Sequence, residues 1–475
     1  MSGSAYSIDG RTFSFAAPFA EAYAVGAYVE ITADDGRRFL AQVLGEWVTS
    51  PGKLEGRGRL VADLGAPEPQ RLDGSAVFGS ASIAAAPDEI VANHLTLTLG
   101  RGVGLALGAI QRTPSVPARL HAKGFGRHTF LCGQSGSGKT YTLGVILERL
   151  LLETNITIVV ADPNSDYVNL GKLRPQEESG LDETDYHLLC ERFAPIAEQI
   201  HVFGDEGSES RLQVKFGRLS TEQQTMVLGI DPIADPDIYN AFIRTVQGMG
   251  GVEYSVDDII TATRSSFADD QRRLGLRMEN LGVDELSIWA GSDEPIAEAL
   301  PPDSRMAVLD LGSLQSERES SIAAAAVLEG LWANRHARTP MIIVIDEAHN
   351  ICPQNPSSPH QALATDLVVR IAGEGRKFGL YLLLATQRPE KVHQNVVSQC
   401  DNLILMKMNS AADIAQLGET FSYAPRELVD QASGFGLGEG LAAGKIAPDP
   451  LLFKTGRRYT LEGGSDVPST WATRA

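Results

Sequence analysis

The sequence predicts an α/β fold: a core with a parallel sheet, an inserted helical subdomain and a small N-terminal β-barrel. Three observations predict it. Apolar, strand-like runs alternate with helical stretches in residues 113–172 and 304–460, the pattern of a parallel sheet covered by helices on both faces. Short alternating segments punctuated by glycine occupy residues 1–112. Residues 173–303 are mostly polar with a helical rhythm, and they interrupt the core.

Size and composition narrow the class of protein. A chain of 475 residues is too long for one ordinary domain. The net charge of -19 argues against a surface coated with nucleic-acid-binding charge, although a ring could still line its channel with basic residues. The four cysteines are far apart and form no C-x-x-C pair, so neither a zinc site nor a disulfide framework is expected. No apolar run is long enough to cross a bilayer and no signal segment opens the chain, which predicts a cytoplasmic protein without a membrane segment.

The expected barrel begins with a hairpin. Residues 28–32 and 39–44 read as strands that flank an Asp-Asp-Gly turn at residues 34–36. Residues 60–64 and 95–99 continue the alternating pattern and are expected to be further strands. No long helix is expected in this part of the chain.

An extended connector, residues 111–126 with two prolines, is expected to lead into the core. Residues 133–140 then fit the phosphate-binding pattern G-x-x-x-x-G-K-[ST] at every fixed position, between a strand at 128–132 and a helix at 141–152. Glycines allow the backbone N–H groups to point at an anion, while the lysine faces the β- and γ-phosphates of ATP and the threonine ligates Mg²⁺. The predicted phosphate-binding residues are Gly133, Gln134, Ser135, Gly136, Ser137, Gly138, Lys139 and Thr140.

The rest of the core follows as strand and helix in alternation. Residues 156–163 are expected to form a buried strand that ends in an acid, and residues 320–334 a helix. Residues 199–203 are the one strand expected within the helical insertion. Residues 461–475 are expected to be a loose tail. The remaining strands are expected at residues 305–311, 341–345, 381–385 and 402–406.

Two carboxylates close the strand at residues 341–345. The carboxyl end of a strand is where an α/β sheet places its chemistry. Asp346 is expected to hold the Mg²⁺ shell and Glu347 to polarise the attacking water. Such acids could also be a solvated strand end, but their pairing with a phosphate-binding loop favours the catalytic interpretation.

Other polar residues are candidates for a role in hydrolysis. Gln387, at the end of another strand, could sense whether the γ-phosphate is intact. Arg370, or in second place Arg376, could act on the phosphates of a neighbouring subunit, while Arg127 could reach the phosphates of its own subunit or merely cap structure. His349 could relay the state of the nucleotide or be an ordinary loop histidine.

The run Asp-Glu-Ala-His at residues 346–349 suggests a comparison with two-core helicases. Too little chain follows Asp346 to hold a second complete core. A single core has to take its arginine from another chain, which implies a ring. A transporter-type ATPase is disfavoured because no Leu-Ser-Gly-Gly-Gln-like run is present.

Taken together, the motifs resemble the HerA group of the HerA–FtsK motor ATPases over nearly the whole chain. Besides the barrel, the phosphate-binding loop and residues 346–349, the similar motifs are 124–128 (Gly-Phe-Gly-Arg-His), 162–167 (Asp-Pro-Asn-Ser-Asp-Tyr), 370–379, 385–389 (Ala-Thr-Gln-Arg-Pro) and 438–444. The family's Asp-Pro-His-Gly-Glu-Tyr differs from this chain at Asn164 and Ser165, besides the acid-for-acid change at Asp166, which leaves the catalytic residues unaffected.

The resemblance implies a RecA-like P-loop core in a homo-hexamer that binds ATP and Mg²⁺ and threads double-stranded DNA through a central channel. It also implies a partner nuclease or other effector, in DNA end processing or in antiviral defence, docked on the β-barrel. By matching position, Lys139, Thr140, Asp346, Glu347 and Gln387 carry binding, hydrolysis and sensing, with Arg127 in cis and Arg370 in trans. A different role stays open: the hexamer could be an ATP-gated scaffold that regulates an effector enzyme without translocating DNA. A conjugation or secretion ATPase is less favoured because no membrane segment is expected.

Overall fold

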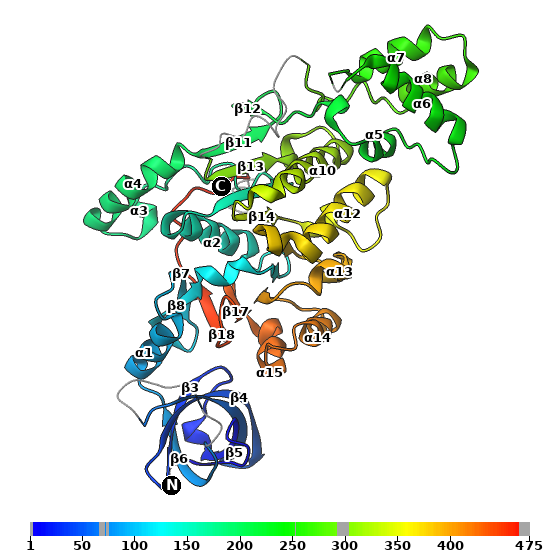
Figure 1. Ribbon diagram of the computed structural model, residues 1–475. Helices are drawn as coiled ribbons and strands as arrows, with labels where there is room; N and C mark the ends of the chain where they lie inside the picture. Colours follow the sequence, from blue (N-terminus) through cyan, green and yellow to red (C-terminus); the bar gives the residue numbers. More distant parts are fainter. Residues whose placement is uncertain (1–2, 66–71, 73–75, 252, 292–303, 465–475) are drawn as a thin grey trace, which may run out of the picture. The chain divides into compact units, whose positions relative to one another are not determined.

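A computed structural model describes residues 3–65, 72, 76–251, 253–291 and 304–464 (Figure 1). The chain divides into two compact units. The first unit is Met1–Thr154 with Cys400–Tyr459, and the second is Asn155–Gln399 with Thr460–Ala475. The expected tail at 461–475 lies largely outside the described residues, as does the end of the expected helical insertion.

A closed β-barrel forms the N-terminal part of the first unit, with strand order β1-β2-β5-β4-β3-β6. Alternate residues point inward, and the interior is packed with aromatic and branched side chains such as Phe13, Phe15, Val29, Ile31 and Phe39. The barrel strands are β1 (Ser4–Ser7), β2 (Thr12–Pro18), β3 (Tyr28–Ala33), β4 (Arg38–Ser50), β5 (Lys53–Asp63) and β6 (Phe78–Ala85).

The expected hairpin is confirmed, because β3 pairs antiparallel with β4 and Gly36 has the positive φ of 88° that the turn requires. The strand expected at residues 95–99 is wrong. These residues belong to helix α1 (Asp88–Leu99), which ends at Gly100 with φ 58°. The threonines that gave the alternating pattern bond back to carbonyls one turn earlier, Thr96 Oγ1 to Ala92 O at 2.8 Å among them.

The first unit also contains sheet strands in the order β9-β16-β17-β18-β7-β8. Strand β9 lies parallel to β16, and the other neighbours are antiparallel. The expected extended connector is instead mostly strand β8, which pairs antiparallel with β7. These strands are β7 (Gly104–Ile110), β8 (Thr113–His121), β9 (Thr129–Cys132), β16 (Asn402–Met406), β17 (Glu439–Gly444) and β18 (Leu451–Thr455).

The second unit carries parallel strands in the order β12-β11-β13-β10-β14-β15. The central strands are buried on both faces, as their unbroken apolar sequences predicted. These strands are β10 (Thr157–Asp162), β11 (Ile200–Gly204), β12 (Ser210–Arg211), β13 (Met306–Asp310), β14 (Met341–Ile345) and β15 (Leu380–Thr386).

Helices complete both units. The predicted helices after the phosphate-binding loop and before β14 are confirmed as α2 and α10. In the second unit, α5 to α8 pack around a core of their own that includes Phe216, Phe242, Ile259 and Leu274 (Figure 1). The other helices are α2 (Lys139–Glu153), α3 (Gln176–Ser179), α4 (Glu183–Ala197), α5 (Thr221–Val227), α6 (Pro236–Met249), α7 (Val256–Arg264), α8 (Asp269–Asn280), α10 (Glu317–Ala333), α11 (Ala348–Ile351), α12 (Pro359–Glu374), α13 (Gln394–Val397), α14 (Ala411–Thr420) and α15 (Arg426–Val429). Among the described helices, none has the length and apolarity needed to span a membrane.

Close packing inside the barrel leads to a stability prediction. A Cβ added to Gly58 on β5 would lie 2.3 Å from Gln42 O and 2.4 Å from Phe13 Cε1. We expect Gly58→Ala to lower the free energy of unfolding by about 1–3 kcal/mol, the usual cost of overpacking. Thermal unfolding followed by circular dichroism measures this. Gly79→Ala on β6 is the matched control, because a Cβ there meets nothing within 4 Å. Equal melting temperatures for both variants would contradict the packing argument.

Candidate active site

The phosphate-binding loop lies in the first unit, between β9 and α2. Gly136 and Gly138 take φ values of 74° and 90°, which only glycine adopts without strain. Gly138 immediately precedes α2, whose first turn has no side-chain cap. The N–H groups of that turn are thus left for an anion, and the helix dipole favours negative charge there.

The loop is fastened at both ends to the same sheet. The N–H of Gln134 donates to Lys407 O at 2.9 Å, and the N–H of Gly438 donates to Ser137 O at 2.9 Å. A Cβ on Gly133 would lie 2.5 Å from Met406 Cβ, so this position also requires glycine. These contacts hold the loop in one curved conformation, and backbone atoms form its inner side.

The residues of this loop fit a nucleotide triphosphate. Ser137 Oγ is fully buried and has no hydrogen-bond partner within the described residues. Buried polar groups are normally hydrogen-bonded, so this hydroxyl fits a donor to a phosphate oxygen. Lys139 is buried at the start of α2, and the half-buried Thr140 follows it. A hydroxyl together with carboxylates is the set of hard oxygen ligands that Mg²⁺ prefers.

Acidic residues gather in the second unit where neighbouring parallel strands end. Asp162 on β10 is in register with Asp310 on β13, and Asp346 directly follows β14. Asp162 and Asp346 are both fully buried. Burial raises the pKa of Asp162 to about 7, against hydrogen bonds from the backbone N–H groups of Tyr167 and Asp166 that lower it.

Asp346 is held by donors on both of its carboxylate oxygens. Oδ1 accepts the N–H of Glu347 at 2.8 Å, and Oδ2 accepts the hydroxyl of Tyr167 at 3.0 Å. The backbone N–H of Asp346 donates to Ala161 O at 3.1 Å. Both the backbone and the carboxylate of Asp346 therefore have one defined orientation.

Glu347 is 6% exposed and has a left-handed backbone, with φ 43° and ψ 48°. Its Oε2 lies 3.3 Å from Nδ1 of His349, and the same Nδ1 lies 3.1 Å from Thr386 Oγ1 at the end of β15. The N–H of Arg388 donates to that Oγ1 at 3.0 Å. These contacts connect Glu347 with the segment that contains Gln387. They fit both interpretations of His349, and its role stays a prediction.

The remaining predicted residues are distributed over both units. In the second unit, Arg370 is exposed on α12, Arg376 is half-buried in the short helix Gly375–Phe378, and Gln387 is half-buried just after β15. In the first unit, the guanidinium of Arg127 lies 3.8 Å from the Asp401 carboxylate. The roles expected of these residues in hydrolysis stay predictions.

Sequence reasoning missed three contacts around these residues: Gly438 against the phosphate-binding loop, Tyr167 on Asp346, and Thr386 on His349. Gly438 and Tyr167 belong to motifs that carried the family resemblance, and that was the available signal. Thr386 lies next to Gln387 and offered none of its own.

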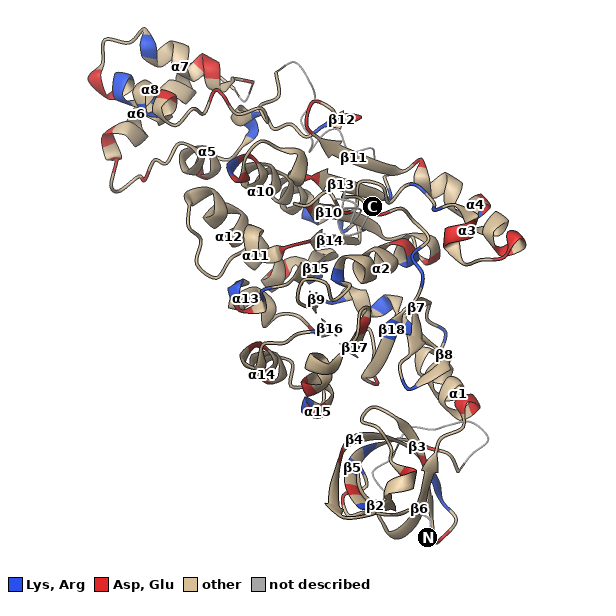
Figure 2. Ribbon diagram, turned by 180° about the vertical axis from the view of Figure 1, so that it is seen from behind, with Lys and Arg blue, Asp and Glu red and all other residues tan. Residues whose placement is uncertain are grey.

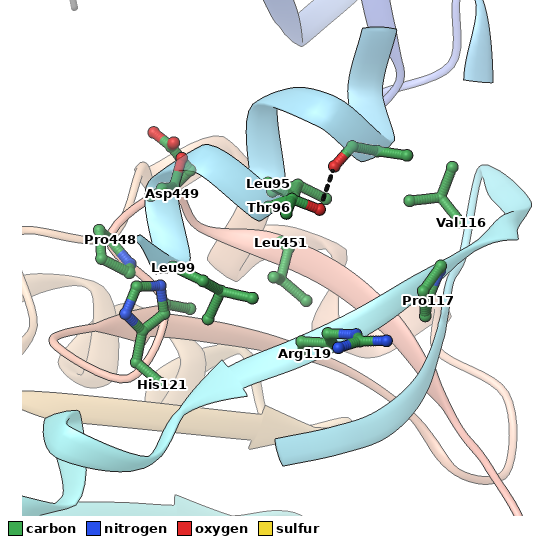
Figure 3. Close-up of a pocket in the computed structure, with 13 residues that line it drawn as sticks. Leu95, Thr96, Leu99, Val116, Pro117, Arg119, His121, Pro448, Asp449 and Leu451 are labelled. Carbon is green, nitrogen blue, oxygen red and sulfur yellow. Dashed lines mark hydrogen bonds between the residues drawn. The ribbon is translucent and has the colours of Figure 1, made fainter. Parts of the chain in front are cut away.

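A cavity of about 250 Å³ lies elsewhere in the first unit, between α1, β8 and residues 447–451 (Figure 3). Its lining combines apolar side chains with Arg119, His121 and Asp449. The Asp449 carboxylate pairs with His94 at 2.8 Å and Arg59 at 3.5 Å. This cavity contains none of the predicted site residues.

Comparison with known proteins finds relatives of this chain among ATPases and helicases. A family model described as the central domain of helicase HerA matches residues 105–329, and one for the ATPase family associated with various cellular activities (AAA) matches residues 296–408. The DNA double-strand break repair helicase HerA of Pyrococcus furiosus is 24% identical over 400 residues, which cover 74% of this chain and 69% of that protein. The protein of the same description from Saccharolobus solfataricus is 25% identical over 364 residues, covering 72% of this chain and 66% of that one.

A solved structure, VirB4 of Thermoanaerobacter pseudethanolicus, shares the fold with a TM-score of 0.52 at 16% identity, over 75% of this chain and 98% of that chain. The fold, the phosphate-binding loop and the family matches define an ATP-hydrolysing P-loop enzyme with a RecA-like core. Within that class, the chain is similar to the HerA-like ATPases.

Proposed function

We propose that this ATPase is a ring-forming motor that translocates double-stranded DNA as a helicase. The observation that carries the proposal is the fixed Asp346–Glu347 pair in a chain that also has a complete phosphate-binding loop and whose relatives are described as DNA repair helicases. Hydrolysis machinery of this kind supplies the energy that a motor needs.

The residues divide the work of hydrolysis among them. Lys139 and the N–H groups of residues 133–140 bind the β- and γ-phosphates, and Thr140 and Asp346 hold Mg²⁺. The metal, when bound, neutralises charge that develops on the phosphates. Glu347 orients the attacking water and takes its proton, Gln387 senses the γ-phosphate, and Arg127 assists within its own subunit.

The proposed ring rests on an arginine that acts on the active site of a neighbouring subunit. Arg370 is exposed at the C-terminal part of α12, where a neighbouring subunit could be reached, and Arg376 is the second candidate. We propose a cytoplasmic homo-hexamer in which each subunit completes the site of the next. The β-barrel has a hydrophobic core of its own, and we propose that it docks a partner nuclease or other effector, in DNA end processing or antiviral defence.

Glu347→Gln tests the base. The variant keeps the shape of the side chain but cannot take a proton, so ATP should bind as in the wild type while kcat falls roughly 10²–10⁴-fold. ATP binding and phosphate release are the measurements. Glu419→Gln, at an exposed position on α14, is the matched control. Turnover retained by Glu347→Gln would show that another residue is the base.

Subunit mixing tests the trans-acting arginine. Arg370→Ala subunits and Lys139→Ala subunits should each be inactive as pure rings. Mixed rings should regain part of the ATPase activity, because a subunit with intact Lys139 can receive Arg370 from a Lys139→Ala neighbour. The exposed Lys377→Ala is the control. If mixing restores nothing, Arg370 acts in cis or not at all, and the same assay applied to Arg376→Ala decides between the two candidates.

Linear duplex DNA tests the motor. We expect DNA to stimulate the wild-type ATPase and to bind with an affinity that falls steeply as salt rises, because phosphate contacts release counterions. Acidic side chains are frequent on α3 and α4 (Figure 2), so these helices are not the expected contact surface. Absence of both stimulation and salt-sensitive binding would contradict the motor.

An effector that co-purifies and responds to Lys139→Ala and Glu347→Ala without DNA would favour the ATP-gated scaffold instead.

A further inference from the structure

The loop at residues 162–167 is folded around one carboxylate. Oδ1 of Asp162 accepts the N–H groups of Asn164 at 3.3 Å and Asp166 at 3.0 Å, and Oδ2 accepts the N–H of Tyr167 at 2.8 Å. Ser165 takes a left-handed φ of 60°, and its hydroxyl donates to Asp310 Oδ1 at 2.6 Å. The carboxylate therefore fixes the path of the chain from β10 to Tyr167.

Tyr167 stands at the end of this loop with its side chain fully buried. Its hydroxyl donates to Oδ2 of Asp346 at 3.0 Å, and Asp346 is also fully buried. The other carboxylate oxygen receives the N–H of Glu347. Tyr167 is thus a side-chain donor, from a different strand connection, that orients the Asp346 carboxylate.

We propose that Tyr167 is a positioning residue for Mg²⁺ binding: through its hydroxyl, the loop at 162–167 aims the Asp346 carboxylate at the metal. The inference rests on the proposed role of Asp346. A donor that is fixed by a hydrogen-bonded loop prevents the Asp346 carboxylate from rotating away from the metal. The loop acts on metal affinity, and ATP itself is bound by other residues.

A buried tyrosine hydroxyl could also serve stability alone, and Tyr28 provides the comparison. Tyr28 is a buried residue of barrel strand β3, and its hydroxyl has no hydrogen-bond partner among the described residues. Tyr28→Phe removes a buried hydroxyl without removing a bond. Any effect that Tyr167→Phe has beyond that of Tyr28→Phe belongs to the bond with Asp346.

The experiment measures binding of a fluorescent ATP analogue with and without Mg²⁺, in full-length Glu347→Gln protein so that nothing is hydrolysed. Mg²⁺ should tighten binding in this parent. Adding Tyr167→Phe should reduce the tightening about tenfold, the factor that a lost hydrogen bond to a charged group is worth. Affinity without Mg²⁺ should be unchanged, and Tyr28→Phe should behave as the parent. In the wild-type background, Tyr167→Phe should raise the Mg²⁺ concentration for half-maximal ATPase by a similar factor.

A second variant shows whether the effect passes through Asp346. In Asp346→Asn protein, Tyr167→Phe should cause no further loss of the Mg²⁺ effect, since the two changes remove one interaction. Additive losses would overturn the inference, and so would a Tyr167→Phe protein that binds Mg²⁺ normally or does not fold. If Mg²⁺ does not tighten binding in the parent, the role of Asp346 is wrong and the inference falls with it. A normal Mg²⁺ effect in the parent that Tyr167→Phe leaves intact overturns the inference alone.

Discussion

The burial of a carboxylate at the end of β14 is the constraint on which the candidate site depends. A buried carboxyl group is costly unless hydrogen-bond partners surround it. For Asp346, the N–H of Glu347 and the hydroxyl of Tyr167 are donors, and the loop that ends at Tyr167 donates its N–H groups to Asp162. Strands β10, β13 and β14 are parallel and in register, which brings their acidic ends to one edge of the sheet. The carboxyl ends of parallel strands are where an α/β sheet places its functional groups, so this register also determines where the candidate site lies.

The sequence predicted the buried strands well because their signal is local. Met341–Ile345 and Asn402–Met406 were found with correct bounds, since an unbroken apolar run bounded by polar residues has few other interpretations. The error at residues 95–99 has the opposite origin. A five-residue alternation of leucine and threonine matches a strand, but the preceding acidic turn at Asp88 and the glycine at 100 make the longer segment a helix. The pairing of β7 with β8 was missed because two prolines in the sequence indicated a connector.

The candidate site was likewise predictable only in part. The phosphate-binding loop could be predicted because its residues are contiguous and glycine is required by geometry at Gly133 and Gly138. The contacts around the predicted catalytic acids could not be predicted, because each joins residues far apart in the chain: Tyr167 with Asp346, and His349 with Thr386. No pattern in a single sequence encodes such a pair. The family resemblance marked both segments without saying what they do to one another.

The backbone of Glu347 explains why so many contacts converge on one short segment. A left-handed conformation costs a non-glycine residue on the order of 1–3 kcal/mol, so it persists only where the surroundings impose it. Here the carboxylate of Asp346 accepts the N–H of Glu347, and the carbonyl of Glu347 accepts the N–H of Asn350 at 2.8 Å. These bonds turn the chain directly from β14 into α11 and bring the side chain of Glu347 to His349. The strain at Glu347 is therefore offset by the same carboxylate that is proposed to bind the metal, which makes the orientation of the proposed base depend on the orientation of Asp346.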